Sequence, residues 1–389
     1  MLRPLESLSA AEAPLSDVLT SMRAMLRTDR LELSLAVEGS SVVDGASDYW
    51  ALRWLGCSVA PVDSSRRRVD VPLEALGLYD DTTAPERRVY PDVMDLLSRD
   101  RPTPMVRLRG SWGRARLWAK LEWYNPLSLS IKDRTAASIL AEALRRRPDA
   151  KVIYEVSSAN TGVALASLAA VMGLRARLYM PVTAESFGPL MARLLGAEVV
   201  QRGSSTVEVL PEAKEEAARD GALMPNQFES PANFLTHVGH TAKEVEAQAN
   251  FAGLKLKGIF VTMGTGGHSA GISFYFKNRR PDVKVFGVQP ARGSVIPGIR
   301  RQDMSSWWPI EERPDVILDV TELDAAAAAV RVARSNGILP GMSGGAAIAA
   351  FESVADELEE GDYVVILPDH GIKYLERYYR LLGKALGLG

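Results

Sequence analysis

Short apolar runs alternate along most of the chain with longer segments in which apolar residues recur every three or four positions. The short runs predict strands at 117–121, 152–156, 176–180, 198–201, 258–263, 283–288 and 363–367. The longer segments predict helices at 132–147, 161–172, 187–195, 269–277, 324–336 and 345–358, and a last helix that ends near residue 386. Because short apolar strands alternate with helices, we predict an α/β fold with parallel sheets built from crossover units.

The first 95 residues follow a different pattern. They contain a helical segment at 15–26, a possible strand at 31–37 and a run of three arginines at 66–68. They contain no glycine-rich loop and no catalytic constellation, so we expect an accessory domain that packs on the core or on a partner subunit. The charged, proline-bearing segment 99–104 marks a boundary. We therefore divide the chain into residues 1–95 and a catalytic region 96–389, whose smaller subdomain spans roughly 130–240.

Composition and charge exclude several classes of function. The chain has 389 residues, of which 47% are hydrophobic and 24% charged, and its net charge is −2. This balance disfavours a nucleic-acid partner and a polybasic membrane anchor. A single cysteine (Cys57) and four histidines disfavour a disulfide framework and a metal site. Residues 1–14 lack the apolar core of a signal peptide, and we expect a cytoplasmic protein without a membrane span.

In parallel sheets, ligands bind beyond the carboxyl ends of the strands. We therefore expect the ligand-binding and catalytic residues in the loops that follow the strands. The first such loop, 125–134, places Lys132 at a helix N-terminus, where the helix dipole disfavours the charged ammonium. A lysine whose pKa is lowered can form a Schiff base. The alternative is a solvated lysine paired with Asp133.

Three further loops open helices. The segment 155–162 brings hydroxyls and an amide to a helix start, where they bind an anion or simply cap the helix. The glycine-rich segment 264–271 favours phosphate binding over a merely tight turn, and it is neither a Walker loop nor a G-x-G-x-x-G fingerprint. Taken alone, the glycines of 341–347 indicate close packing.

In this order, the four loops resemble the fold-type II family of pyridoxal-phosphate (PLP) enzymes, especially the cysteine synthases. Residues 125–134 match N-P-x-x-S-x-K-D-R with one extra residue, 157–162 loosely match T-S-G-N-T-G, and 264–268 match G-T-G-G-T. Three other stretches are similar to the family: 103–108 to its opening, 227–233 to Q-F-x-N-P-A-N, and 368–375 to P-D-x-x-x-R-Y-L. The resemblance covers about residues 100–380, and the N-terminal extension looks like that of the archaeal O-phosphoserine sulfhydrylases. It implies two open, mostly parallel α/β domains of the tryptophan synthase β-like type, and a homodimer.

The resemblance also implies roles for individual residues. Lys132 would hold PLP as an internal aldimine and act as the catalytic base, Asn160 would contact the 3′ oxygen of the pyridine ring, and Ser343 would face the pyridine nitrogen. The residues expected to bind the cofactor phosphate are Gly264, Thr265, Gly266, Gly267 and His268. The residues expected to hold the substrate carboxylate are Ser157, Ser158, Thr161 and Gln227.

Three positions depart from the family pattern. Ala159 stands where the family has glycine, His268 stands where it has threonine, and Gly344 replaces a frequent serine. His268 would therefore donate through its backbone, or through its side chain if the imidazole is protonated. A neutral serine at the pyridine nitrogen favours β-elimination over transamination.

The reaction implied by the resemblance is β-replacement through an aminoacrylate, in which sulfide replaces a leaving group. Arg300 sits where relatives that use phosphoserine place an arginine, and a phosphate leaving group favours arginine. Thr206 is a second phosphate candidate. We therefore predict that O-phosphoserine and sulfide give cysteine, unless Arg300 and Arg301 form a solvated surface pair.

Other readings stay open at this point. O-acetylserine sulfhydrylase or cystathionine β-synthase activity would use the same scaffold, and a threonine synthase-like elimination fits segment 227–233 less well. A non-catalytic regulatory protein that binds PLP or another ligand would be expected to lack Lys132. A nucleotide-binding protein would use the glycines at 264–267, but no acidic partner for a ribose or a magnesium ion stands at a matching spacing.

Overall fold

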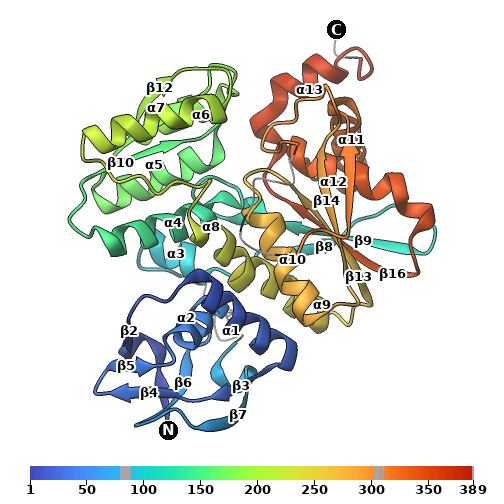
Figure 1. The fold of residues 1–389 in the computed structure, drawn as a ribbon. Coiled ribbons are helices and arrows are strands. Elements are labelled where there is room, and N and C mark those ends of the chain that lie inside the picture. Colours follow the sequence, from blue (N-terminus) through green and yellow to red (C-terminus); the bar gives the residue numbers. More distant parts are fainter. Residues whose placement is uncertain (79–88, 302–307, 309–310, 388–389) are drawn as a thin grey trace.

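The computed structural model describes residues 1–78, 89–301, 308 and 311–387, and it forms three connected parts (Figure 1). The N-terminal region lies at one end of the molecule. Above it are two lobes, one built on a three-stranded sheet and the other on a six-stranded sheet (Figure 1). These parallel sheets with flanking helices confirm the predicted α/β fold.

The smaller lobe has a parallel sheet in the order β10 (Val152–Val156), β11 (Arg175–Met180), β12 (Glu198–Gln201). Its helices are α4 (Lys132–Arg146), α5 (Asn160–Met172), α6 (Phe187–Leu194) and α7 (Thr206–Arg219). Four of the five residues of β10 are buried, as expected for a strand covered on both faces. Helix α5 is buried over nine of its thirteen residues because it packs against α4, α6 and the sheet.

The larger lobe has a six-stranded sheet in which only the edge pair β8–β9 is antiparallel. Its order is β15 (Val316–Val320), β14 (Lys284–Pro290), β13 (Leu256–Thr262), β16 (Gly361–Leu367), β9 (Ala115–Leu121), β8 (Met105–Arg107). The helices around it are α8 (Pro231–Thr236), α9 (Lys243–Phe251), α10 (Gly267–Arg279), α11 (Glu322–Asn336), α12 (Met342–Val354) and α13 (Leu375–Leu382). Stacked rings of Phe260 and Phe286, 4.4 Å apart, fill part of the core beside this sheet.

The N-terminal region has a five-stranded sheet, a two-stranded ladder and two helices. The sheet order is β1 (Leu2–Pro4), β6 (Val59–Asp63), β4 (Leu35–Glu38), β5 (Ser41–Asp44), β2 (Ser9–Ala10). The ladder pairs β3 (Arg30–Leu33) with β7 (Arg68–Pro72), the helices are α1 (Leu15–Thr28) and α2 (Ala46–Leu55), and α3 (Val93–Arg99) leads into the catalytic region. Short 3₁₀ helices lie at Leu5–Ser7, Glu74–Leu76, Glu122–Tyr124, Ala355–Glu357 and Gly371–Tyr374.

The N-terminal region packs against helices of the larger lobe through a shared hydrophobic core. Met22 of α1 and Leu52 of α2 belong to the same hydrophobic cluster as Phe234 of α8 and Phe274 of α10. A π-helix, His237–Ala242, follows α8, and its Gly239 lies against the end of α2. A Cβ atom at Gly239 would come within 1.7 Å of the Trp54 carbonyl oxygen, so the close approach requires glycine.

Several element boundaries differ from the prediction. The strand predicted at 31–37 is two strands, β3 and β4, interrupted at Ser34, whose hydroxyl accepts a hydrogen bond from the Arg67 backbone N–H. The helix predicted at 345–358 spans Met342–Val354, because its glycines lie inside the first turn. The last helix ends at Leu382 instead of near residue 386. In the catalytic region, helices α7, α8 and α9 and strands β8 and β15 were not predicted. Before it, helices α2 and α3 and strands β1, β2, β5, β6 and β7 were not predicted either.

Candidate active site

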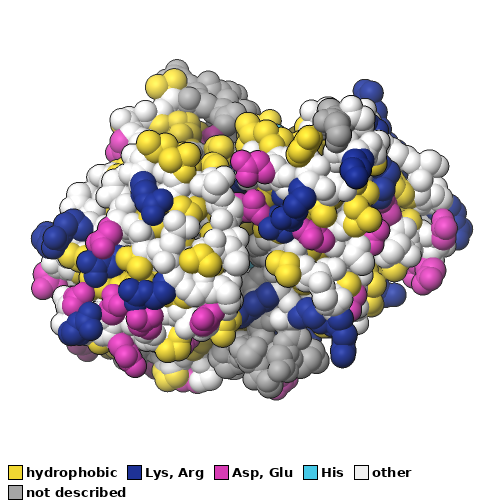
Figure 2. All heavy atoms as spheres, turned by 90° about the horizontal axis from the view of Figure 1, so that it is seen from above, with side chains coloured by type: hydrophobic (Ala, Val, Ile, Leu, Met, Phe, Trp, Pro, Cys, Tyr) yellow, Lys and Arg dark blue, Asp and Glu magenta, His cyan; other side chains and the backbone are white. Residues whose placement is uncertain are grey.

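A cavity of about 300 Å³ lies between the two lobes, at the carboxyl ends of β10 and β13. Figure 2 shows this end of the molecule, with a hollow between the lobes and with acidic and basic side chains interspersed on the surface. The predicted site residues that line the cavity are Lys132, Ser157, Ser158, Asn160, Thr161, Thr206, Gln227, Gly264, Thr265, Gly266, His268, Arg300 and Ser343. The fold therefore brings together residues that are spread over more than half of the sequence.

Lys132 is the first residue of α4 and lines the cavity. Burial lowers the pKa of its ammonium to about 8, and the neighbouring Lys373 acts in the same direction. The carboxylate of Asp133 does not pair with Lys132. It accepts the backbone N–H groups of Leu127 (2.6 Å) and Ser128 (2.8 Å), and burial raises its pKa to about 6. The solvated Lys132–Asp133 pair is therefore wrong as an interpretation of this loop.

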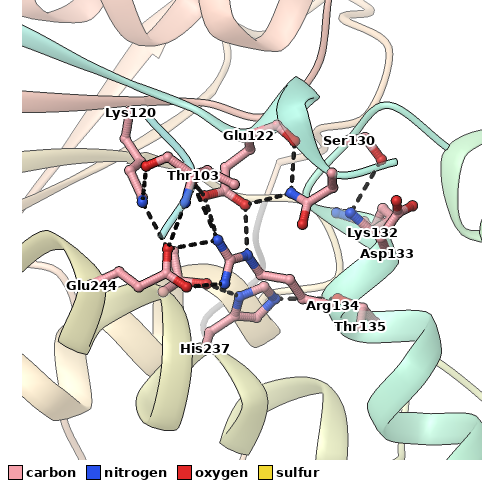
Figure 3. A network of polar contacts seen from close by, with 12 residues as sticks. Thr103, Lys120, Glu122, Ser130, Lys132, Asp133, Arg134, Thr135, His237 and Glu244 are labelled. Carbon is pink, nitrogen blue, oxygen red and sulfur yellow. Dashed lines mark hydrogen bonds and ion pairs between the residues drawn. The ribbon is translucent and has the colours of Figure 1, made fainter. Parts of the chain in front are cut away.

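The first turn of α4 is fixed by a buried ion cluster (Figure 3). The Arg134 guanidinium bonds to Glu122 (2.7 Å) and to Glu244 (2.6 Å), and the Lys120 ammonium bonds to Glu244 (2.7 Å). Burial opposes the charge on Arg134, but the two carboxylates raise its pKa above the ordinary value. Because the cluster has two cations and two anions, its charges balance. The cluster joins β9, the short helix Glu122–Tyr124, α4 and α9, and its Arg134 lies two residues after Lys132 in α4.

The glycine-rich loop after β13 leads into the N-terminus of α10. Gly266 has φ = +85°, a conformation that glycine adopts at little cost. Gly267 does not line the cavity itself. A Cβ atom there would lie 2.4 Å from Oδ1 of Asn233, whose Nδ2 donates to the Thr265 hydroxyl (2.9 Å) and to the Gln227 carbonyl (2.7 Å). Asn233 thus ties the loop to the segment that carries Gln227.

His268 occupies the second position of α10 and lines the cavity. Burial lowers the pKa of its imidazole to about 3, and Lys132 adds to this, so the ring is neutral near pH 7. Its Nε2 atom is buried and has no hydrogen-bond partner among the residues that the structure describes. The ring lies 5.2 Å from that of His237, which contacts Thr135 of α4 through Nε2 (3.2 Å).

The substrate loop is internally bonded. The Ser157 hydroxyl accepts the Gly162 backbone N–H (2.9 Å) and so caps the start of α5. The Thr161 hydroxyl donates to Gln227 Oε1 (2.7 Å), and Gln227 Nε2 donates to the Val156 carbonyl (2.7 Å). Ser158 is exposed to the cavity. All four residues expected to hold the substrate carboxylate line the cavity, but the side chains of Thr161 and Gln227 are already hydrogen-bonded to each other.

The two arginines predicted as a possible surface pair differ in environment. Arg301 is exposed and bonds to Asp319 and to the Pro290 carbonyl, each at 2.7 Å. Arg300 is partly buried in the cavity wall, its guanidinium lies 5.7 Å from the centre of the Phe228 ring, and burial lowers its pKa. The interpretation as a solvated pair therefore fails for Arg300.

Thr206 begins α7 at the edge of the cavity. The donors of Ser204, two residues before it, are already used, because the Glu208 carboxylate accepts its backbone N–H (2.8 Å) and its hydroxyl (2.7 Å). A phosphate at this loop would meet the Glu208 charge, and Thr206 would offer its hydroxyl and its backbone N–H at the start of α7.

Several lining or supporting residues were missed in the sequence. Arg377 lines the cavity and bonds to Glu185 and Glu322, each at 2.6 Å, so both lobes contribute to this contact. Asn160 bonds to Lys373 and Asp369, which belong to the quoted P-D-x-x-x-R-Y-L segment. That motif was the available signal, but it did not indicate which residue each side chain would contact.

Comparison with known proteins agrees with this geometry. Residues 96–369 match the family model described as pyridoxal-phosphate dependent enzyme. Cysteine synthase B of Escherichia coli is 34% identical over 290 residues, which cover 70% of this chain and 91% of that protein. Cysteine synthase of Staphylococcus aureus is 33% identical over 289 residues, covering 70% and 92%.

The chain belongs to the pyridoxal-phosphate-dependent cysteine synthase family. Solved structures are similar as well. A hydrogen sulfide-producing enzyme from Fusobacterium nucleatum has a TM-score of 0.68 at 27% identity, covering 74% of this chain and all of that one. A cysteine synthase from Entamoeba histolytica has a TM-score of 0.67 at 27% identity, covering 77% and 93%. The protein is therefore a PLP-dependent enzyme, and residues 1–95 lie outside the family match.

The cavity residues fit the cofactor of this family. A partly desolvated lysine suits a Schiff base with an aldehyde, and the Gly264–His268 loop at the start of α10 suits a phosphate. The unpartnered Nε2 of His268 is a buried polar atom that a bound group would satisfy. In the part of the chain that the structure describes, no cluster of three His, Cys, Asp or Glu side chains could hold a metal ion, and no helix combines the length and apolar character needed to span a bilayer.

Proposed function

We propose that the protein is a cysteine synthase that converts O-phospho-L-serine and sulfide into L-cysteine and phosphate. In this reaction the Cβ–O bond of the substrate breaks, phosphate leaves with the bonding electrons, and the sulfur atom of sulfide takes its place on Cβ. Similarity to proteins named cysteine synthase supports the reaction class. The preference for a phosphate leaving group is supported by Arg300.

Lys132 would hold the cofactor and then move the α-proton. Its pKa of about 8 lies close to neutral pH, where a general base works best because it is both available and basic. PLP, when bound, accepts the electron pair left by the departing α-proton. Lys132 takes that proton and returns it to the same carbon after sulfur has added. Ser158 and the free backbone N–H groups at the start of α5 would hold the substrate carboxylate.

The single observation that carries the choice of leaving group is the position of Arg300. Its guanidinium is partly buried in the cavity wall, where a dianionic phosphate would compensate the cost of desolvation. Arg300 is our candidate for the phosphate because it lines the cavity beside Phe228, with Thr206 as a second contact.

The test is a titration of the PLP-loaded protein with O-phosphoserine and with O-acetylserine, followed by visible absorption. We expect the yellow cofactor band to change at a lower concentration of O-phosphoserine. Arg300→Ala should raise the concentration needed for O-phosphoserine by about tenfold or more, the scale of a lost charge-assisted hydrogen bond. It should leave the response to O-acetylserine within about twofold.

Arg301→Ala is the matched control, because Arg301 is exposed and bonded to Asp319. It should respond to both substrates like the wild type. Equal losses for both substrates in Arg300→Ala would overturn the assignment. Absence of a yellow band after addition of PLP would point instead to a binding role without turnover.

A second candidate is O-acetylserine sulfhydrylase activity. A solved structure named O-acetylserine sulfhydrylase isoform 3, from Entamoeba histolytica, has a TM-score of 0.66 at 28% identity and covers 77% of this chain and 94% of that one. A wild-type response that favours O-acetylserine would select this candidate and would leave the proposed role of Lys132 unchanged.

Three broader expectations belong to the same proposal. Residues 1–95 would form an accessory domain next to a catalytic region with a smaller subdomain at roughly 130–240. The protein would be a cytoplasmic homodimer. Light scattering of the purified chain checks the dimer, and fractionation of the native cells checks the location.

A further inference from the structure

The side-chain amide of Asn160 is held between a cation and an anion. The Lys373 ammonium donates to its Oδ1 atom (2.7 Å), and its Nδ2 atom donates to Oδ2 of Asp369 (2.8 Å). The two charged groups lie 3.7 Å apart. Lys373 is 6% exposed and Asp369 is 1% exposed, so water screens their electrostatic interactions with the amide only weakly.

The chemistry of these partners dictates which way the amide points. An ammonium can only donate hydrogen bonds, and an ionised carboxylate can only accept them. A flipped Asn160 would place its NH₂ group against Lys373 and its oxygen against Asp369. Tyr374 supports the observed arrangement, because burial and the Asp369 charge raise its pKa well above the ordinary value and its hydroxyl donates to the same Asp369 oxygen (2.6 Å).

Lys373 also holds the loop that leads to Lys132. Its ammonium donates to the carbonyls of Ser128 (2.7 Å) and Leu129 (3.1 Å). This loop carries one residue more than the family motif, and Leu129 has φ = +53°, a left-handed conformation unusual for leucine. The three hydrogens of the ammonium are thus divided between the lysine loop and Asn160, at a position where the family motif has arginine.

We propose that the Lys373–Asp369 pair orients the Asn160 amide so that its nitrogen presents a hydrogen to the ring oxygen of bound PLP and keeps that oxygen ionised. An amide nitrogen carries two hydrogens, and Asp369 accepts one of them. A donor aimed at the ring oxygen favours its deprotonated form. The inference rests on the proposed contact between Asn160 and the cofactor ring, and it makes Lys373 and Asp369 positioning residues.

The experiment compares absorption spectra and cofactor dissociation constants of PLP-loaded variants before any substrate is added. Lys373→Met removes the donor at Oδ1. We expect part of the yellow absorbance to move to the near-ultraviolet band of the protonated ring, and PLP affinity to fall about tenfold. Lys373→Arg restores a cation and should keep the yellow band.

A matched control separates this effect from the loss of a buried lysine. Lys243 is 1% exposed and donates to the Leu55 carbonyl (3.0 Å), away from the cavity. Lys243→Met should lower the melting temperature and leave the ratio of the two bands unchanged. If Lys373→Met does not fold, Lys373→Met with Asp369→Asn removes both charges and should show the same loss of the yellow band.

The outcomes distinguish this inference from the proposed function. A wild-type band ratio in Lys373→Met or in the double variant would overturn the inference, as would an equal shift in Lys373→Arg or Lys243→Met. A wild-type protein that does not bind PLP at all would instead overturn the proposed function.

Discussion

Arg134 and Glu244 face each other through two hydrogen bonds of 2.6 and 2.8 Å, although they come from α4 and α9, which are far apart in the sequence. Arg134 is 0% exposed and Glu244 is 3% exposed. Removing one member of such a pair strongly destabilises the fold, because it leaves an uncompensated charge in the interior.

Arg134→Met is therefore expected to lower the free energy of unfolding by about 3–5 kcal/mol. Equilibrium unfolding in urea measures this loss. The control is Arg331→Met, which breaks a surface pair with Glu352 and should cost less than about 1 kcal/mol. A loss in Arg134→Met no larger than that of the control would show that the buried cluster is not a major source of stability.

The buried carboxyl group of Glu155 should make the free energy of unfolding depend on pH. Burial raises its pKa to about 8, and its Oε2 atom has no hydrogen-bond partner within the described part of the chain. In the unfolded chain the same carboxyl loses its proton near pH 4.5. Between these values the folded state binds the extra proton, so the free energy of unfolding falls as pH rises, by at most about 1.4 kcal/mol per pH unit.

Glu155→Gln removes this term and should make the stability less dependent on pH between about pH 5 and pH 8. Urea unfolding at several pH values checks the slope, and the exposed Glu215→Gln serves as the control. Identical slopes for wild type and Glu155→Gln would contradict the prediction.

Gly239→Ala tests how the N-terminal region is docked. The added methyl group would overlap the Trp54 carbonyl, so α2 must move away from the π-helix. We expect a loss at or above the upper end of the range of about 1–3 kcal/mol found for overpacked cores, together with a change in tryptophan fluorescence. Gly253→Ala adds a methyl group to open space at φ = +62° and should cost only about 1–2 kcal/mol without the fluorescence change. Equal effects of the two variants would argue against the close contact.

Glu185→Gln tests the charge balance of the cavity. The carboxylate of Glu185 partly neutralises Arg377, and both side chains line the cavity. Without this charge the cavity should bind a phosphate-bearing substrate more tightly, and we expect KM for O-phosphoserine to fall about two- to fivefold. Glu322→Gln, which alters the other partner of Arg377, lies outside the cavity and should have a smaller effect. An increase of KM in Glu185→Gln would contradict the prediction.

The sequence located the site because its signals are local. Lys132 and the glycines of 264–267 follow short apolar strands and open helices, so a few neighbouring residues reveal them. Contacts between residues that are far apart in the sequence gave no such local signal. Lys373 reaches Asn160 across 213 positions, and Arg134 reaches Glu244 across 110. Helix α7 buries Val209, Ala213 and Ala217 at four-residue spacing, and it was missed because Pro211 lies inside it, where a proline usually ends a helix.

The shared hydrophobic cluster constrains the order of events during synthesis. The N-terminal region leaves the ribosome before both lobes, yet part of its apolar surface packs against α10 and the π-helix His237–Ala242, which are made after the entire smaller sheet. Until then, side chains such as Met22 and Leu52 lack the neighbours that bury them in the finished protein. Residues 1–78 are therefore expected to complete their packing late in translation and to unfold together with the larger lobe in one cooperative transition.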